Sequence, residues 1–219
     1  DQPRSRGLGD VYKRQMFAVT FTANRDSRWL FEILQFLFRH IEELNNQEFG
    51  DYFKEFLEKM AVRYAEERLF TEDKSIKKYG AIPVYAFNFV DYVLWKNREE
   101  LKKDYDIEFG DFKFAYRRSI EHWYPQNPNG HDGESQLSSE FLHSFGNLCI
   151  ITDSQNSRFG NSYPEAKLEQ WEREGIFHRQ SLKLQMMAKV TSKKNRWDIG
   201  EIQSMEKEVE RYVQNFCNS

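Results

Sequence analysis

The stretch SIEHWYPQN, residues Ser119–Asn127, lies past the middle of this 219-residue chain and sets a carboxylate beside an imidazole. Just before it, from Phe112 to Tyr116, aromatic residues alternate with small or basic ones, which is the period-two pattern of a half-buried strand. Pro125 and the Asn, Pro and Gly residues after it end the pattern and begin a polar loop that extends to about Glu140. The sequence therefore predicts a strand that ends near His122.

A second strand and a helix are expected after this loop. Leu148–Thr152 is a compact apolar run of strand length, and Asp153 or Ser154 begins a new helix or turn. The order around the motif is thus strand, loop, strand, helix. Phe17–Thr22 alternates and is expected to form a short strand or the tail of an element removed by truncation. Further helices are expected at Arg28–Asn46, Phe49–Leu69, Pro83–Lys103, Pro164–Glu174, Ser181–Val190 and Ile199–Phe216. The predicted fold class is α+β, mainly α-helical.

The amino-acid composition limits both the kind of protein this chain can be and the kind of partner it can attract. A chain with 39% hydrophobic and 16% aromatic residues can build a core, which excludes global disorder. The net charge of −3 means that a nucleic acid would have to be attracted by a local basic patch. Between Ser154 and Arg196 nine Lys and Arg face four Glu, whereas Met16–Gly110 carries 14 basic and 18 acidic residues. Taken alone, such an excess of Lys and Arg more often reflects basic side chains on the solvent-exposed faces of helices.

Cysteine usage and hydropathy indicate a cytoplasmic protein. Cys149 and Cys217 show neither a disulfide framework nor metal-ligand spacing, which fits a reducing compartment. The sequence contains no run of about 18 apolar residues and no secretion signal. We therefore expect a soluble protein of the prokaryotic cytoplasm.

Residues 1–15 resemble a translated sequencing adaptor, because Asp10–Gln15 reads as the translation of a transposase end sequence. A natural polar tail is the alternative. On the adaptor interpretation the native sequence begins at or after Met16, and a preceding domain is missing. The rest divides into a helical region, residues 16–110, and a region that carries the motif and C-terminal helices, residues 111–219.

The motif supplies the residues that phosphodiester hydrolysis with one divalent ion needs. His122 can act as general base, since its reference pKa near 6.5 makes it neutral at physiological pH. Glu121 and Asn156 offer the oxygen ligands that suit Mg²⁺ or Mn²⁺, and the amide of Asn147 can orient the His122 ring. Glu121 points to the opposite face of an ideal strand, so an irregular backbone is required for both side chains to meet one phosphate.

Each of these residues also has a structural explanation. Glu121 and His122 fit a surface pair, Asn147 after a Gly fits a turn, and Asn156 fits a helix cap. These separate explanations become less convincing because the residues occur together, in the order and at the spacing of the motif. The remaining histidines of this half, His131, His143 and His178, lack partners at the spacing of a closed zinc site.

The order Glu-His, Gly-Asn-Leu, then Asn with a downstream Lys resembles the C-terminal HNH-like nuclease domain of GmrSD-type (type IV, modification-dependent) restriction endonucleases. The resemblance covers roughly residues 112–200. Its most specific segments are Glu121–Gln126, Leu142–Leu148 and Asn156–Ser162, leading to Glu165–Lys167, and Ser181 and Trp197 also match.

The resemblance implies a ββα unit that grips one metal ion. It assigns His122 as base, Glu121 and Asn156 as metal ligands, and Asn147 as the orienting residue. Lys167 would contact phosphate or brace the loop, and we expect Arg158 to bind substrate as well. Two departures are modest: Trp123 replaces a commoner aliphatic residue, and Asn156 stands where His is frequent.

The leading hypothesis is a metal-dependent DNA endonuclease domain of a restriction or phage-defence protein. DNA that carries modified bases is one candidate substrate. The family resemblance also implies a preceding nucleotide-dependent domain. The alternatives are a catalytically inactive nucleic-acid-binding module and an RNase or toxin nuclease with the same ββα-metal unit. Metal dependence separates the first two, since a binding module should ignore chelators.

Overall fold

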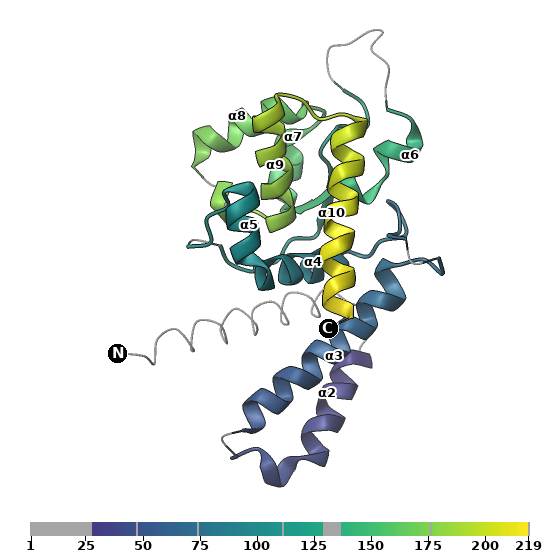
Figure 1. Cartoon of the computed structure of the whole chain (residues 1–219), viewed down its shortest axis with the longest axis vertical. Helices are drawn as coiled ribbons and strands as arrows, with labels where there is room; N and C mark the ends of the chain where they lie inside the picture. Colours follow the sequence, from purple (N-terminus) through teal and green to yellow (C-terminus); the bar gives the residue numbers. More distant parts are fainter. Residues whose placement is uncertain are drawn as a thin grey trace.

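The computed structural model describes residues 28–46, 48–73, 75–110, 112–128, 137–175 and 177–218. The adaptor-like segment 1–15, the strand predicted at 17–22 and His131 lie outside these ranges. Most of the described chain is helical, and one antiparallel two-stranded sheet lies among the helices (Figure 1). The predicted α+β, mainly helical class is confirmed.

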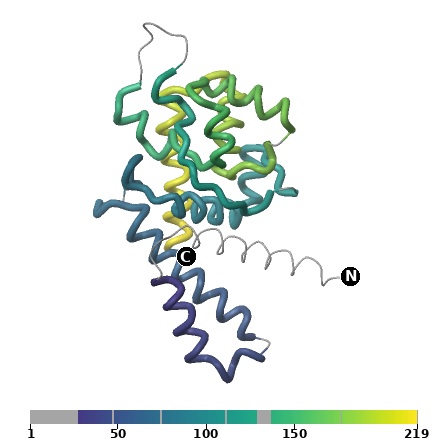
Figure 2. Tube along the Cα trace, turned by 180° about the vertical axis from the view of Figure 1, so that it is seen from behind, coloured from purple at the N-terminus to yellow at the C-terminus, as the bar shows by residue number. Residues whose placement is uncertain are grey.

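A helical hairpin projects from the main body, as both ribbon and tube views show (Figures 1 and 2). It consists of α2 (Arg28–Arg39), the 3-10 turn η1 (Ile41–Glu43) and α3 (Phe49–Leu69). The stacked rings of Phe36 and Phe56, with centroids 4.0 Å apart, join the two helices. The first helix is therefore shorter than predicted, because the chain turns after Arg39.

Helix α4 (Val84–Lys96) forms the centre of the core. Every residue from Tyr85 to Trp95 is buried, including the polar side chains of Asn88 and Asp91, as in a helix that is covered on all sides. It contacts α3, α9 (Leu182–Lys194), α10 (Ile199–Cys217) and the second strand, so one core spans both sides of residue 110.

The single helix predicted over Pro83–Lys103 is two helices. The chain bends at Asn97, whose side-chain Nδ2 donates to the Val93 carbonyl oxygen at 2.8 Å. Helix α5 (Arg98–Tyr105) then follows. An Asn side chain that bonds the preceding turn competes with helix continuation, which accounts for the break.

The sheet pairs β1 (Ser119–His122) with β2 (Leu148–Ile151), and His122 lies opposite Leu148. The longer strand predicted from Phe112 was wrong, because the segment before Ser119 has no strand partner in the described chain. Phe112 and Phe114 are buried, yet the alternation then fails: Tyr116 is 52% exposed and Arg117 is buried. The Arg117 guanidinium turns inward because it donates to the Arg179 carbonyl oxygen.

Two of the helices after β2, α7 (Asp153–Phe159) and α9, contact the sheet. Helix α7 starts in a capping box made by Thr152 and Gln155 and contacts β1. Two antiparallel strands are thus followed by a helix that lies against the first strand. The connection before β2 holds α6 (Ser139–Leu142) and η2 (Phe145–Asn147), and α8 (Pro164–Glu174) and η3 (Phe177–Arg179) complete the fold.

The turn η2 is held closely by α10 and α9. A Cβ added at Gly146 would lie 2.0 Å from the Ile202 carbonyl oxygen, so only glycine fits here. Ser144 Oγ donates to the Glu206 carboxylate of α10. The buried ammonium of Lys183, from α9, donates to the carbonyl oxygens of Phe145 and Leu148. Backbone approach and buried hydrogen bonds therefore fix the turn that precedes β2.

We expect Gly146→Ala to lower the free energy of unfolding by about 1–3 kcal/mol, because the new methyl group overlaps backbone that cannot rotate away. Gly50→Ala is the matched control, since a Cβ at this α3 position meets nothing within 4 Å. Chemical denaturation measures both. Equal stability of the two variants would contradict the close approach of η2 and α10.

Candidate active site

The His122 imidazole is buried at the end of β1 with both ring nitrogens engaged. Its Nε2 lies 3.0 Å from His143 Nδ1, and its Nδ1 lies 3.1 Å from the side-chain Nε2 of Gln126. The Tyr79 ring meets it edge to face, with centroids 4.6 Å apart. Burial, with smaller effects of His143 and Lys167, lowers the pKa of His122 to about 4. The ring is therefore neutral at physiological pH, as a general base must be.

Glu121 faces the other side of the strand pair. The pairing stays regular past His122, since Trp123 N donates to the Asn147 carbonyl oxygen at 2.8 Å, so neighbouring side chains alternate between faces. The Glu121 carboxylate accepts from Lys167 Nζ at 2.6 Å. Burial raises the pKa of Glu121, and the Lys167 ammonium opposes that shift by attraction. The irregular strand end that the sequence argument required is not found, so the predicted meeting of Glu121 and His122 at one phosphate is wrong for this arrangement: the two side chains lie on opposite faces of the strand pair.

Lys167 enters the site from α8 and is fully buried. Besides Glu121, its ammonium donates to the carbonyl oxygens of His122 (2.7 Å) and Trp123 (3.0 Å). A lysine ammonium has three donors, and all three are used here. Of the two roles considered for Lys167, this geometry supports the bracing of the strand end.

Asn147 is the last residue of η2, directly before β2, and is fully buried. Its Oδ1 accepts from Tyr124 N (2.8 Å) and Trp197 Nε1 (3.1 Å), and its Nδ2 donates to the carbonyl oxygens of Tyr124 (3.1 Å) and Leu142 (3.0 Å). These four hydrogen bonds use both acceptor sites and both donor sites of the side-chain amide. Asn147 thus joins the segment after β1 to the end of α6 and to Trp197 before α10, and its amide has no capacity left for the His122 ring.

Asn156 and Arg158 both lie on α7. Asn156 is in its first turn, as predicted, with an exposed side chain. Arg158 is exposed too, and its guanidinium donates to the Glu174 carboxylate at 3.1 Å. The side of α7 that carries Phe159 lies near Lys167, whose ammonium is 5.9 Å from the Phe159 ring centroid. Helix α7 is therefore on the Glu121 side of the strands.

Sequence reasoning missed three neighbours of His122. Gln126 stands four residues after it, within the motif itself, and His143 stands four residues before Asn147. Their spacing was a usable signal, although His143 was considered only as a zinc ligand. Tyr79 comes from the segment between α3 and α4, far away in sequence, and no pattern in the chain signalled it.

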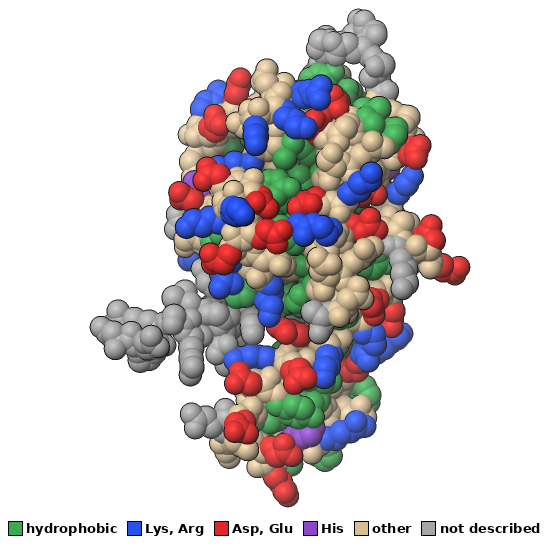
Figure 3. All heavy atoms as spheres, viewed as in Figure 1, with side chains coloured by type: hydrophobic (Ala, Val, Ile, Leu, Met, Phe, Trp, Pro, Cys, Tyr) green, Lys and Arg blue, Asp and Glu red, His purple; other side chains and the backbone are tan. Residues whose placement is uncertain are grey.

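The basic excess of residues 154–196 does not form one exposed patch. Figure 3 shows Lys and Arg interspersed with Asp and Glu over the face in view. Two of the nine basic residues, Lys167 and Lys183, are buried. Four others take part in ion pairs: Arg158 with Glu174, Lys189 with Asp106, Lys194 with Glu201, and Arg196 with Asp198.

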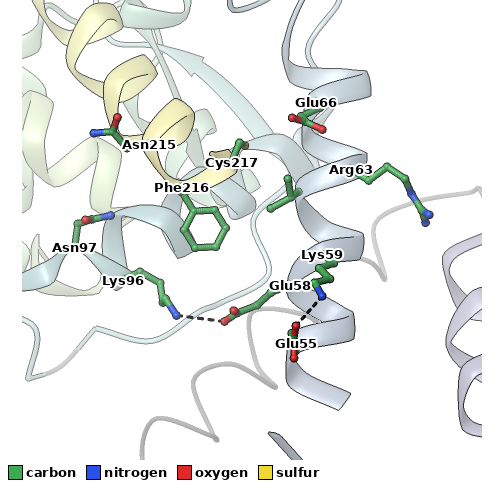
Figure 4. A pocket seen from close by; sticks show the side chains of 11 residues that line it. Glu55, Glu58, Lys59, Arg63, Glu66, Lys96, Asn97, Asn215, Phe216 and Cys217 are labelled. Carbon is green, nitrogen blue, oxygen red and sulfur yellow. Dashed lines mark hydrogen bonds and ion pairs between the residues drawn. The ribbon is translucent and has the colours of Figure 1, made fainter. Parts of the chain in front are cut away.

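A cavity of about 640 Å³ lies away from His122, between α3, α4 and the end of α10 (Figure 4). Two ion pairs lie among its lining residues, with Lys96 Nζ 3.3 Å from Glu58 and Lys59 Nζ 2.6 Å from Glu55. None of its lining residues belongs to the motif. The described residues contain no group of three or more His, Cys, Asp or Glu side chains placed for a metal ion.

A family model for GmrSD restriction endonucleases, C-terminal domain, matches residues 67–209. The chain belongs to this family. The GmrSD match begins near the end of α3 and ends within α10, so it includes all the residues described around His122 and Glu121. Membership implies a function related to restriction endonucleases, with DNA as substrate. No match was found among curated proteins or among solved structures.

No helix in the described part of this GmrSD domain is long and apolar enough to cross a bilayer.

Proposed function

We propose that the chain is a metal-dependent, HNH-like endonuclease domain that hydrolyses phosphodiester bonds in DNA. The observation that carries the proposal is the His122 imidazole, which is neutral, buried and held at both nitrogens at the end of β1. The strand, loop, strand, helix order around it supports a ββα-metal unit built from β1, β2 and α7.

In this mechanism His122 takes a proton from a water molecule. One O–H bond of the water breaks, the proton moves to the imidazole, and the hydroxide attacks phosphorus as the bond to the departing oxygen breaks. A positioned general base contributes typically about 10²- to 10⁴-fold in rate. Lys167 and Asn147 act on the backbone beside the base, since they hold the carbonyl and amide groups of the strand end.

The two predicted metal ligands fit a hard divalent ion by their chemistry. Both lie on the side of the strand pair opposite His122, however, so the proposal requires the Glu121 or His122 side chain to turn around the strand end for base and ion to act on one phosphate. Lys167 occupies Oε1 of Glu121, and no hydrogen bond within the described chain uses Oε2. The Asn156 side chain is exposed on the α7 surface. One carboxylate and one amide oxygen suit Mg²⁺ or Mn²⁺, which keep several waters. When bound, such an ion would neutralise charge on the phosphate and on the departing oxygen.

We expect Asn156→Ala to raise the Mg²⁺ concentration for half-maximal cleavage by about 10-fold, because one of few protein ligands is lost. Asn215→Ala, at an exposed position of helix α10, is the matched control. Cleavage of unmodified and modified DNA is measured across a Mg²⁺ titration. A half-maximal concentration that is the same in both variants would remove Asn156 from the metal site.

The ion pair between Glu121 and Lys167 favours one alternative, a catalytically inactive module that holds nucleic acid, because the pair neutralises the predicted ligand carboxylate. A chelator separates the two functions: EDTA should abolish cleavage by the nuclease, whereas an inactive module would show metal-independent binding and no cleavage. An RNA substrate in the same assay tests the RNase alternative.

The finer assignments belong to the same proposal. We propose that the domain serves phage defence in a prokaryotic cytoplasm, that base-modified DNA is its substrate, and that a nucleotide-dependent domain precedes it in the intact protein. Cleavage of modified but not unmodified DNA by the intact protein, stimulated by a nucleotide, is the expected result. Equal cleavage of both DNAs without nucleotide would contradict these assignments.

A further inference from the structure

The two hydrogen-bond partners of the His122 ring differ in how firmly they are held. Gln126, at Nδ1, has an exposed side chain in the loop after β1. His143, at Nε2, is half-buried at the end of α6. An exposed glutamine side chain has rotamer freedom that a ring packed between neighbours lacks.

Tyr79 and α6 fix His143 in place. Tyr79 N donates to the His143 carbonyl oxygen at 2.9 Å, and His143 N donates to the Ser139 carbonyl oxygen at 3.1 Å. The Tyr79 ring stacks on the His143 ring, with centroids 5.5 Å apart, and meets the His122 ring edge to face. Three rings and two backbone hydrogen bonds thus form a built arrangement around His122 Nε2.

The hydrogen-bond pattern distinguishes the two ring nitrogens. A neutral imidazole has one N–H and one lone pair, and an amide NH₂ group can only donate. With Gln126 presenting its Nε2 to His122 Nδ1, the tautomer assigned to His122 carries its lone pair on Nδ1 and its hydrogen on Nε2. In this tautomer His122 Nε2 donates to His143 Nδ1.

We propose that His143 is the positioning residue of the site, which holds His122 by Nε2 so that Nδ1 faces the attacking water. The inference rests on the proposed role of His122 as general base. The Gln126 amide marks the place of that water, because an O–H can replace its N–H as the donor to Nδ1. When the proton of the water moves to Nδ1, the N–H bond at Nε2 stays intact and still donates to His143.

The test compares His143→Ala and His143→Asn with the unaltered full chain, since an Asn amide can occupy the place of Nδ1 of a histidine. We expect His143→Ala to lower kcat for DNA cleavage by about 10-fold with KM unchanged, and His143→Asn to restore most of the loss. His40→Ala, in the projecting hairpin, should cleave normally. With ¹⁵N-labelled histidine, NMR should show a protected proton on His122 Nε2 that disappears in His143→Ala and returns in His143→Asn.

Each outcome decides one question. Loss of cleavage in His122→Ala but normal cleavage and an unchanged Nε2 proton in His143→Ala would overturn the positioning role and leave the proposed function intact. Full cleavage by His122→Ala would instead remove the general base. A larger loss in Gln126→Ala than in His143→Ala would show that Nδ1 is the held nitrogen. If no DNA is cleaved, the Nε2 proton alone decides, and its absence in the unaltered chain overturns the inference.

Discussion

His122→Ala should lower cleavage of DNA by about 10²-fold or more while the dissociation constant for DNA changes little, because the ring acts on water and not on affinity. Cleavage is measured under single turnover, with binding measured separately by fluorescence anisotropy in EDTA. The loss is expected to be the largest of any substitution in the site, since His122 is the residue proposed to take the proton of the water, whereas its neighbours His143 and Gln126 are proposed only to contact its ring.

Two controls keep this result interpretable. His40→Ala removes an imidazole from the projecting hairpin and should cleave like the unaltered protein. Thermal melting of His122→Ala checks that the buried position tolerates the smaller side chain. Undiminished metal-dependent cleavage by a folded His122→Ala variant would exclude His122 from the mechanism.

Lys167→Met should lower the free energy of unfolding by about 3–5 kcal/mol, because it leaves the Glu121 carboxylate buried without its cation. Lys189→Met is the matched control: its ammonium pairs with Asp106 at 3.2 Å, but both partners are solvent-accessible, so its melting temperature should barely change. Denaturation in guanidinium measures the two variants. If Lys167→Met loses no more unfolding free energy than the control, Lys167 does not brace the strand end.

The pH dependence of that loss tests its cause. Without Lys167 only burial acts on Glu121, and burial raises the pKa of its carboxyl group. An acid whose pKa is raised in the folded state loses stability as the pH rises above its unfolded value, about 4.3, and regains it as the pH falls. The destabilisation should therefore be smaller at pH 5 than at pH 8. The double variant Glu121→Leu with Lys167→Met, which removes both charges, should recover most of the stability.

The helices and the position of the sheet could be predicted from sequence, because both depend on local periodicity. The bounds of α3 and α8 agree with the prediction, and the residues of β2 agree to within one position. The prediction of a strand before Ser119 was wrong, and periodicity could not have shown this. A strand needs a partner, and β2 is only four residues long.

The candidate site was predictable in its residues but not in its contacts. His122 and Asn147 lie at the two strand ends where the motif put them. Their partners come from distant parts of the chain: Tyr79 precedes α4, Lys167 lies on α8 and Trp197 precedes α10. A lysine in an amphipathic helix is normally exposed, so the burial of Lys167 and Lys183 can be learned only from the packing.

The support of the η2 turn by α10 has a consequence for biosynthesis. Trp197 and Glu206, which hold Asn147 and Ser144, lie C-terminal to every residue proposed to act in the reaction. A ribosome therefore completes all the site residues before it releases the helix that organises them. A nascent chain or a product of premature termination before Ile199 would carry the whole motif together with Lys183 and Trp197, but without the contacts of Glu206 to Ser144 and Gly146, so the η2 turn gains this support only after α10 has been translated.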